Sequence, residues 1–485
     1  MVKQSQRKFQ KSVKFYKILL EIAKKMLYSR LWTFIKINYK KITFITKIYH
    51  LYLTCVKKCN IIIACRIWEK NGGLALAIGD IIVGIDIGTS KVSTVVGEVN
   101  NFNQIEIICS TYSKCSAIKK GKIVSEEDLA VAISKTIKEA EDISNLKINS
   151  AYTTIPGKYV TIVQNSIVKE AKDKFAGISV KDVASAIIQV RDIEVPEDKV
   201  LVDIVPDKFI LEDGKAIEDP VGKFSASFTL TAQIILAEKE YVKQITSVFK
   251  KAGLEIDGIV PVTLAERNLV LDTNELSDNI MLLDIGAGNT DIGVFNGTSF
   301  IYTNTIALGG DNITSDISYV LNISPEEADK LKRQYGLALR SFIDNDNNIV
   351  LNTCKDIGEK NKTIKSSDLV EIIEARIEEV FNLVNKDIIA RGIKSNINNV
   401  VLTGEGIVNI NKSDMAGKII LNIPVKISTG RLISTIKSTY RTSYALVRYI
   451  AARPYARTVS SSIDTRAEKS IGKIILEKVK DFFYS

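Results

Sequence analysis

Two stretches of the chain share one order of apolar and polar positions, and each predicts a β-hairpin. In the first, the apolar runs Ile81–Ile87 and Val92–Val99 flank a short turn of small and polar residues. About two hundred residues later, Met281–Ile285 and Ile292–Phe295 flank a second turn of the same kind. Apolar runs of this length, bounded by such turns, are typical of strands. The repeat therefore predicts two related halves that face each other.

Both hairpins carry chemistry that suits the phosphates of a nucleotide. Gly, Ser and Thr in a tight turn can offer backbone N–H groups and hydroxyls to phosphate oxygens. Asp86 and Asp284, one in each hairpin, could hold Mg²⁺ through water, and Lys91 could neutralise phosphate charge. A single hairpin of this kind can equally be a turn in which glycine merely allows the backbone angles. The pattern is neither a Walker A loop nor a dinucleotide fingerprint, because a strand follows each turn.

A third glycine-rich turn, Thr403–Gly406, follows the apolar run Asn399–Leu402. Alone it would be an ordinary junction between a strand and the next element. As the third motif in this order, it could form the floor for a purine ring or a ribose.

In this order the three motifs resemble those of the actin-like ATPase superfamily, and residues 79–485 resemble its FtsA family. Further matches are Asp219–Gly222, Leu308–Ile317 and Pro325–Lys332. The resemblance implies an α/β, actin-like (ribonuclease-H-like) two-domain ATPase fold. It further implies that subdomain IB is missing, that an SHS2-like subdomain called 1C is present, and that a C-terminal amphipathic helix ends the chain. At 157–238, where we place 1C, periodicity independently predicts a strand at Val160–Val168, a helix at Val180–Val190 and two more strands at Val200–Ile204 and Phe228–Ile235.

The predicted organisation follows from this resemblance and from the shifts in composition. The segments are a basic leader (1–78), subdomain 1A (79–156, 239–275 and 436–452), subdomain 1C (157–238), subdomain 2A (276–325 and 395–435), subdomain 2B (326–394), a linker (453–468) and an amphipathic membrane-targeting helix (469–485).

The resemblance implies ATP and Mg²⁺ as ligands. The nucleotide-binding residues that it implies are Asp86, Gly88, Thr89, Ser90 and Lys91 in the first hairpin, Asp284, Gly286, Gly288 and Asn289 in the second, Gly309, Gly310, Gly404, Glu405 and Gly406 in the loops, and Asp329 with Lys332 for the ribose. Asp86 and Asp284 would hold the metal through water. The spacing of Asp329 and Lys332 also fits a solvent-facing strip of salt bridges on a helix.

Several positions depart from the family's usual pattern. Ala287, Asn289 and Glu405 stand where Gly, Thr and Gly are usual, although the backbone donors survive all three changes. Relatives often place a water-orienting Glu or Gln before a Pro-centred turn, whereas here Val260 precedes Pro261. Valine can neither orient nor deprotonate water. We therefore expect ATP binding with at most slow hydrolysis, and we assign no catalytic residue.

Charge is distributed unevenly, although the composition of 485 residues, 46% hydrophobic and 25% charged, is that of a folded protein with more than one domain. Residues 1–70 hold 17 of the 66 Lys and Arg but only two acids, whereas the rest holds 49 basic and 54 acidic residues. The leader could be a basic arm for nucleic acid or anionic lipid. Alternatively it is translated upstream sequence, with a native start near Leu74–Gly79, because Gly72-Gly73 can be encoded by a ribosome-binding sequence and Leu76 by a TTG start codon.

Composition also limits chemistry and location. The longest uncharged run in the leader, Ile48–Val56, is too short to span a bilayer, and the leader lacks the features of a signal peptide. One histidine, His50, excludes most chemistry that needs a histidine pair. Six cysteines in so long a chain form no disulfide framework, which favours a reducing compartment.

The tail predicts an amphipathic helix at the end of the chain. On a helical projection its apolar residues gather on one broad side: Ile471, Ile474, Ile475, Leu476, Val479, Phe482 and Phe483. The pattern alone also fits a last helix packed on its own domain. Its place after a polar linker, and the resemblance, favour a helix that lies in the membrane interface.

The resemblance implies an ATP-binding cell-division protein that polymerises head to tail and anchors FtsZ filaments to the cytoplasmic face of the membrane at the division septum. FtsZ would bind through 326–394. The next subunit and later division proteins would bind through 1C, and an anionic membrane surface would bind the tail, with no nucleic acid as partner.

A PilM-like pilus assembly ATPase is the alternative, but it does not predict the terminal helix. A sugar kinase often uses Trp or His in its pocket, and residues 79–485 contain neither. An Hsp70-type chaperone needs a substrate domain after residue 450, where about 35 residues remain.

Overall fold

The computed structural model describes residues 79–100, 104–172, 177–272, 274–351, 362–428 and 436–453. Every described residue belongs to one compact unit, Gly72–Ser485, which we call the second unit because it follows Met1–Asn71. The predicted leader, the terminal helix and all of the predicted linker except its first residue, Arg453, lie outside the described residues. Within the described ranges, no helix combines the length and the apolar character that a membrane crossing requires.

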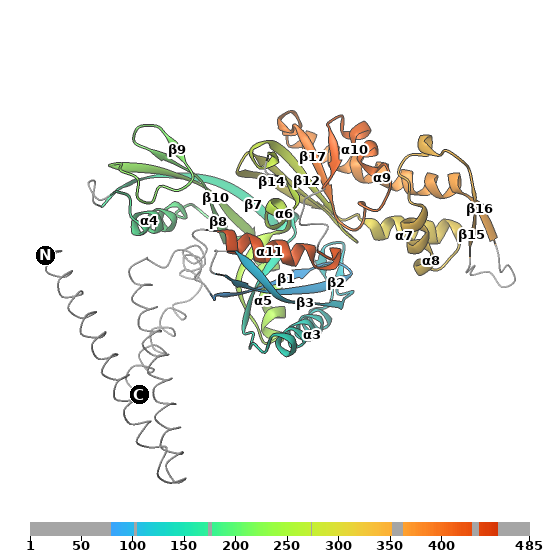
Figure 1. Ribbon diagram of the computed structural model, residues 1–485, viewed down its shortest axis with the longest axis horizontal. Coiled ribbons are helices and arrows are strands. Elements are labelled where there is room, and N and C mark those ends of the chain that lie inside the picture. The colour runs from blue at the N-terminus through green and yellow to red at the C-terminus, as the bar shows by residue number, and fades with distance from the viewer. Residues whose placement is uncertain are drawn as a thin grey trace, which may run out of the picture. The chain divides into compact units, whose positions relative to one another are not determined.

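The first half of the second unit is a five-stranded sheet covered by helices on both faces (Figure 1). Its strand order is β11-β6-β1-β2-β3, with β1 antiparallel to β2 and parallel to β6. Helices α6 and α11 cover one face, and α3 and α5 cover the other. The bounds are β1 Ile81–Ile87, β2 Lys91–Val99, β3 Ile105–Lys114, β6 Ser150–Ile155, β11 Glu255–Pro261, α3 Glu126–Ser144, α5 Lys239–Lys251, α6 Val262–Val270 and α11 Arg441–Ala452.

The second half repeats this design. Its sheet runs β14-β13-β12-β17-β18, so β12 takes the place of β1, β13 that of β2 and β17 that of β6. The bounds are β12 Asn279–Ile285, β13 Thr290–Asn296, β14 Ser299–Ile306, β17 Asn399–Thr403, β18 Val425–Ile427, α7 Gly310–Leu321, α8 Pro325–Tyr335, α9 Ser366–Ala390, α10 Ser413–Leu421, β15 Asn348–Leu351 and β16 Lys362–Lys365. The two related hairpins predicted from the sequence are confirmed.

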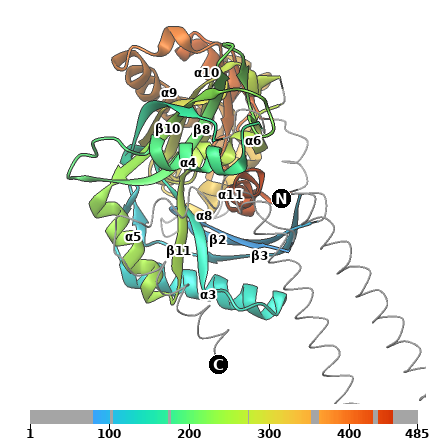
Figure 2. The same ribbon diagram turned by 90° about the vertical axis from the view of Figure 1, so that its left-hand side faces the viewer.

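A separate small subdomain is inserted between β6 and α5. Its antiparallel sheet has the order β7-β10-β8-β9, and α4 packs on β7 and β10 over a core of its own (Figure 2). The bounds are β7 Val160–Glu170, α4 Val180–Val190, β8 Lys199–Leu211, β9 Ala216–Ile217 and β10 Ser227–Glu238. A capping box between Ser179 and Asp182 starts α4.

The predicted strand, helix and two strands are therefore present in this subdomain. The strand predicted at Val200–Ile204 nevertheless extends to Leu211, and the one predicted at Phe228–Ile235 extends to Glu238. β10 pairs with a neighbour on each side along its length, so pairing carries both strands beyond their most apolar stretches.

Strand β8 fastens the inserted subdomain to both halves. Asp203, which is 3% exposed, accepts two bonds from Arg453 at the end of α11, with distances of 2.8 and 2.9 Å. Four residues further along β8, Asp207 accepts a bond of 2.7 Å from Thr298, in the turn between β13 and β14, and one of 2.6 Å from Ser299, the first residue of β14. The position of the inserted subdomain is thereby tied to both halves of the unit.

Candidate nucleotide site

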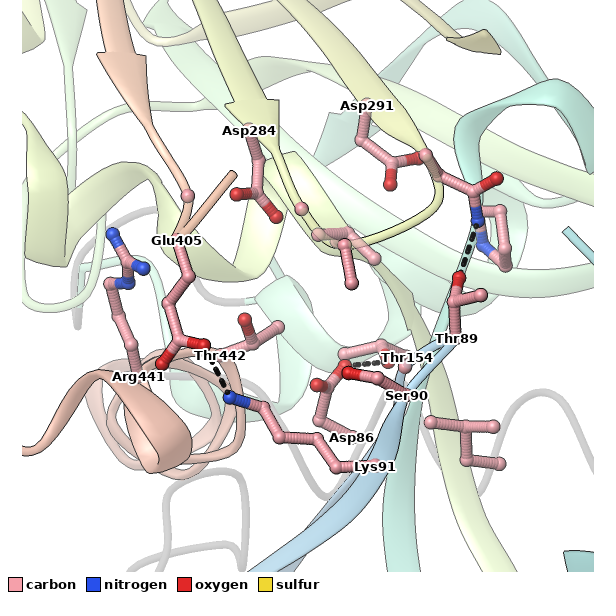
Figure 3. A pocket seen from close by; sticks show the side chains of 18 of the residues that line it. Asp86, Thr89, Ser90, Lys91, Thr154, Asp284, Asp291, Glu405, Arg441 and Thr442 are labelled. Carbon is pink, nitrogen blue, oxygen red and sulfur yellow. Dashed lines mark hydrogen bonds and ion pairs between the residues drawn. The ribbon is translucent and has the colours of Figure 1, made fainter. Parts of the chain in front are cut away.

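The two hairpin turns and the loop after β17 meet at a cavity of about 110 Å³ (Figure 3). The start of α11 closes its remaining side, with Arg441 and Thr442 among the lining residues. The predicted site residues that line the cavity are Asp86, Gly88, Thr89, Ser90, Lys91, Asp284, Gly286, Asn289, Gly404 and Glu405. Residues about two hundred positions apart in the sequence thus share one site, although their roles toward a nucleotide stay predictions.

The remaining predicted glycines lie beside the cavity and let its loops approach one another. A Cβ atom at Gly309 would lie 2.6 Å from the carbonyl oxygen of Ala287, and one at Gly288 would lie 2.6 Å from the Thr89 methyl group. At Gly310 the nearest atom would be the Cα of Gly406, also at 2.6 Å. Such distances exclude any larger side chain unless the neighbouring loop moves.

The loop after β17 is packed even more tightly. A Cβ atom at Gly406 would lie 2.2 Å from the carbonyl oxygen of Gly286, so this loop rests on the turn of the second hairpin. Gly404 has a φ of +100°, a conformation that side chains rarely adopt. Glycine is therefore required at both positions by the packing of the loop.

Asp329 and Lys332 do not line the cavity. The Lys332 Nζ lies 2.8 Å from Asp329 Oδ1, 2.6 Å from Thr314 Oγ1 and 3.0 Å from the carbonyl oxygen of Gly310. Lys332 is only 6% exposed, so the alternative of a solvent-facing strip is wrong for this residue. The pair joins α8 to the first turn of α7, and its contact with ribose stays a prediction.

Three carboxyl groups in the cavity have raised pKa values. Loss of hydration raises the pKa of Asp86 to about 6, although the Thr154 hydroxyl donates to its carboxylate at 2.9 Å. Burial raises the pKa of Asp291 to about 7, although hydrogen bonds from the Thr305 hydroxyl and the Gly157 N–H act to lower it. Burial raises the pKa of Asp284 as well. Each carboxylate therefore lacks sufficient positive charge around it.

Two cations of the first half reach across the cavity to the loop of the second. Lys91 Nζ lies 3.1 Å from Glu405 Oε2 (Figure 3). Arg441 Nη1 donates to the Thr403 hydroxyl at 2.5 Å. Loss of hydration works to raise the pKa of Glu405, but a hydrogen bond from Ser438 and the charges of Lys91 and Arg441 lower it overall. Glu405 is thus held as a carboxylate by residues of the opposite half.

Sequence reasoning missed several residues of this site. Asp291 could have been found, since it ends the second hairpin motif as a second acid. Thr154, Arg441 and Thr442 come from segments with no motif, and only the packing of β6 and α11 brings them to the cavity. Glu266 lies fully buried on α6, where its Oε1 accepts from Thr442 at 2.7 Å and its Oε2 has no partner.

The donor set fits Mg²⁺ bound through water and phosphate. Asp86 and Asp284 come from opposite hairpins and line one cavity (Figure 3). The described residues contain no group of three or more acids, histidines or cysteines that could hold a metal directly. Mg²⁺ typically takes one or two carboxylates together with water and substrate phosphates. A divalent cation here would also relieve the excess negative charge that the raised pKa values reveal.

Comparison with known proteins decides the family. A sequence profile described as "Cell division protein FtsA" matches residues 281–446. The FtsA cell-division protein of Bacillus subtilis (strain 168) is 30% identical over 326 residues, which cover 67% of this chain and 73% of that protein. The chain belongs to the FtsA family. FtsA of Escherichia coli (strain K12) is 27% identical over 334 residues, covering 67% of this chain and 78% of that protein.

The inserted subdomain agrees with the FtsA assignment. A profile described as "SHS2 domain inserted in FTSA" matches residues 157–236. The chain is thus an actin-like protein of a cell-division family, with the SHS2 domain that this family carries.

Two solved structures are similar to this chain at lower sequence identity. The PilM–PilN type IV pilus biogenesis complex has a TM-score of 0.49 at 15% identity, covering 76% of this chain and 97% of that chain. MreB5 of Spiroplasma citri bound to ADP has a TM-score of 0.46 at 13% identity, covering 79% and 98%. Both scores lie below 0.5, so the actin-like fold is inferred from the strand order and the family. The family profile and the Bacillus subtilis relative support FtsA rather than the PilM-like alternative.

Proposed function

We propose that this FtsA-family chain binds ATP with Mg²⁺ in the cavity between its halves and anchors FtsZ filaments to the membrane at the division septum. The observation that carries the nucleotide part is the convergence of two acid-bearing hairpins and a glycine-rich loop on one cavity. The raised pKa values of Asp86 and Asp291 support it, because a divalent cation would balance their charge.

Each part of the cavity has a defined task in this proposal. The turn at Gly88–Ser90 offers backbone N–H groups and hydroxyls to phosphate oxygens, and Lys91 balances phosphate charge. Asp86 and Asp284 orient the water shell of Mg²⁺. Mg²⁺ held between these two carboxylates would balance part of the phosphate charge.

Slow hydrolysis is proposed because the position before Pro261 carries neither an acid nor an amide. Val260 is 1% exposed within β11 and does not line the cavity, and its side chain has no group that could activate water. Val262, the next lining residue on that segment, is equally apolar. The protein therefore acts as a switch that is set by bound ATP, with a turnover well below the roughly one to a thousand per second that is usual for enzymes.

The partners are proposed from the family. FtsZ binds through residues 326–394, and the inserted subdomain contacts the next subunit in a head-to-tail filament as well as later division proteins. The apolar side of 471–483, which lies outside the described residues, inserts into the membrane interface. These contacts would place the protein at the cytoplasmic face of the membrane.

A flotation experiment tests this function. The full chain is mixed with ATP, Mg²⁺, anionic liposomes and FtsZ from the same organism, and FtsZ in the floated fraction is measured against a chain ending at Glu468. We expect FtsZ to float only with the full chain. A matched variant, Ile475→Glu with Phe482→Glu, should behave like the shortened chain. Flotation of the protein without FtsZ would contradict the adaptor role, and equal flotation of all variants would contradict the anchor.

A further inference from the structure

The cavity is too small for the ligand that it is proposed to bind. Its volume is about 110 Å³, whereas pockets for small molecules usually measure about 300–1,000 Å³. Phosphate groups fit such a space, but a complete nucleotide does not. Separation of the two halves would give a base and a ribose the room that this space lacks.

Contacts between the halves account for this closure. Lys91, Arg441 and Ser438 belong to the first half. They contact Thr403 at the end of β17 and Glu405 in the loop that follows it, both in the second half. We call Lys91, Arg441, Thr403 and Glu405 the cross-cleft bracket. The same loop packs on the turn of the second hairpin, so the bracket connects the first half to both the loop and that turn.

Glu405 gives Lys91 an anionic partner from the opposite half of the unit. Its carboxylate is an anion within 3.1 Å of Lys91, and the Lys91 and Glu405 side chains are 22% and 30% exposed. In the described structure the Lys91 ammonium group is thus already paired with an anion from its own chain. A phosphate that enters the cavity competes with Glu405 for the same ammonium group.

We propose that the cross-cleft bracket holds the nucleotide-free cleft closed, with Glu405 standing in for phosphate as the partner of Lys91 until ATP displaces it. This inference rests on the proposed ATP-binding function. Opening the cleft breaks the Lys91–Glu405 pair, and ATP restores a partner to Lys91 through its phosphates. Adenosine has no phosphate, so it must open the cleft without restoring that pair.

Because of this difference, Lys91→Gln should change the affinities for ATP and for adenosine in opposite directions. The variant should bind ATP more weakly, because a phosphate contact is lost, but bind adenosine about fivefold more tightly, because the closed state is weakened. Glu405→Gln should bind both ligands more tightly. The double variant should bind adenosine no better than either single variant, because both substitutions remove one interaction. Simple repulsion between Glu405 and phosphate would leave the affinity for uncharged adenosine unchanged.

The experiment measures ATP and adenosine affinities by calorimetry on the full chain with Mg²⁺. Lys122→Gln is the matched control, because Lys122 is an exposed lysine on β5 (Lys122–Ile123) that does not line the cavity. Hydrogen–deuterium exchange without nucleotide gives a second readout. Peptides covering residues 400–410 should exchange faster in both single variants than in the wild type, and at the wild-type rate in the Lys122→Gln control. Peptides from α3 should stay protected in every variant. Glu405→Ser repeats the test if Glu405→Gln folds poorly.

The outcomes separate this inference from the proposed function. Tighter adenosine binding by Lys91→Gln together with faster exchange at 400–410 supports the bracket. ATP binding by the wild type, with adenosine affinity and exchange unaltered in the variants, overturns the bracket alone. A wild-type protein that binds neither ligand overturns the proposed function and the bracket together.

Discussion

Replacing Asp86 by Asn should stabilise the nucleotide-free protein while it abolishes Mg²⁺-dependent ATP binding. The carboxyl is only partly hydrated, and its pKa rises from 3.8 to about 6. A shift of roughly two pKa units corresponds to about 3 kcal/mol of lost stability in the ionised state. Asn keeps the acceptor for the Thr154 hydroxyl, which lies 2.9 Å from Asp86 Oδ1, but it carries no charge. The variant should therefore recover most of that loss.

The pH dependence has a defined sign. The folded carboxyl holds its proton more tightly than the unfolded one, so the stability gained from protonation is present below about pH 4 and is lost as the pH rises through 6. The variant should exceed the wild type by about 3 kcal/mol at pH 7.5 and by about 1 kcal/mol at pH 4.5.

Urea denaturation at both pH values measures this difference. Asp198→Asn is the control, because Asp198 is exposed and lies outside the cavity, and its effect should be within about 0.5 kcal/mol. Adding ATP with Mg²⁺ at pH 7.5 should stabilise the wild type and leave the Asp86 variant unchanged. A variant less stable than the wild type at pH 7.5, or a difference independent of pH, would refute the reasoning.

Three further predictions concern the loop, the inserted subdomain and the metal. Gly406→Ala should lower ATP affinity at least about tenfold in calorimetry, because its Cβ would lie 2.2 Å from the Gly286 carbonyl oxygen; unchanged affinity would show that the loop yields freely. Arg453→Met should lower the free energy of unfolding by about 3–5 kcal/mol, since Asp203 is left buried and unpaired, and Asp203→Leu in the same chain should restore most of it. Removing Mg²⁺ with EDTA should weaken ATP binding at least about tenfold, and equal affinity without metal would exclude the proposed task of the carboxylates.

The hairpins could be predicted because their signals are local. In Ile81–Val99 the apolar runs and the turn chemistry lie within twenty residues, and the structure has strands at both runs. Strands β8 and β10 of the inserted subdomain were predicted too short. Their ends depend on pairing with neighbouring strands rather than on their own apolar residues. Local pattern therefore locates a strand better than it locates its end.

The polar network of the cavity could be predicted only in part. Asp86 and Asp284 are found from the repeated motif, but Arg441 reaches the cavity because α11 packs on β1 and α6, which no short motif records. The burial of Lys332 likewise depends on α7 lying beside α8. Glu405 was visible as a departure from the usual glycine, yet its pairing with Lys91 required the two halves to be placed together.

Calorimetric titration of the full chain with ATP, with and without Mg²⁺, tests the central claim most directly. The cavity should bind one nucleotide per chain in the presence of Mg²⁺, and Asp284→Ala should remove binding while the protein remains folded by circular dichroism. No binding of ATP at millimolar concentration, or equal binding by Asp284→Ala, would contradict the assignment of this cavity as the nucleotide site.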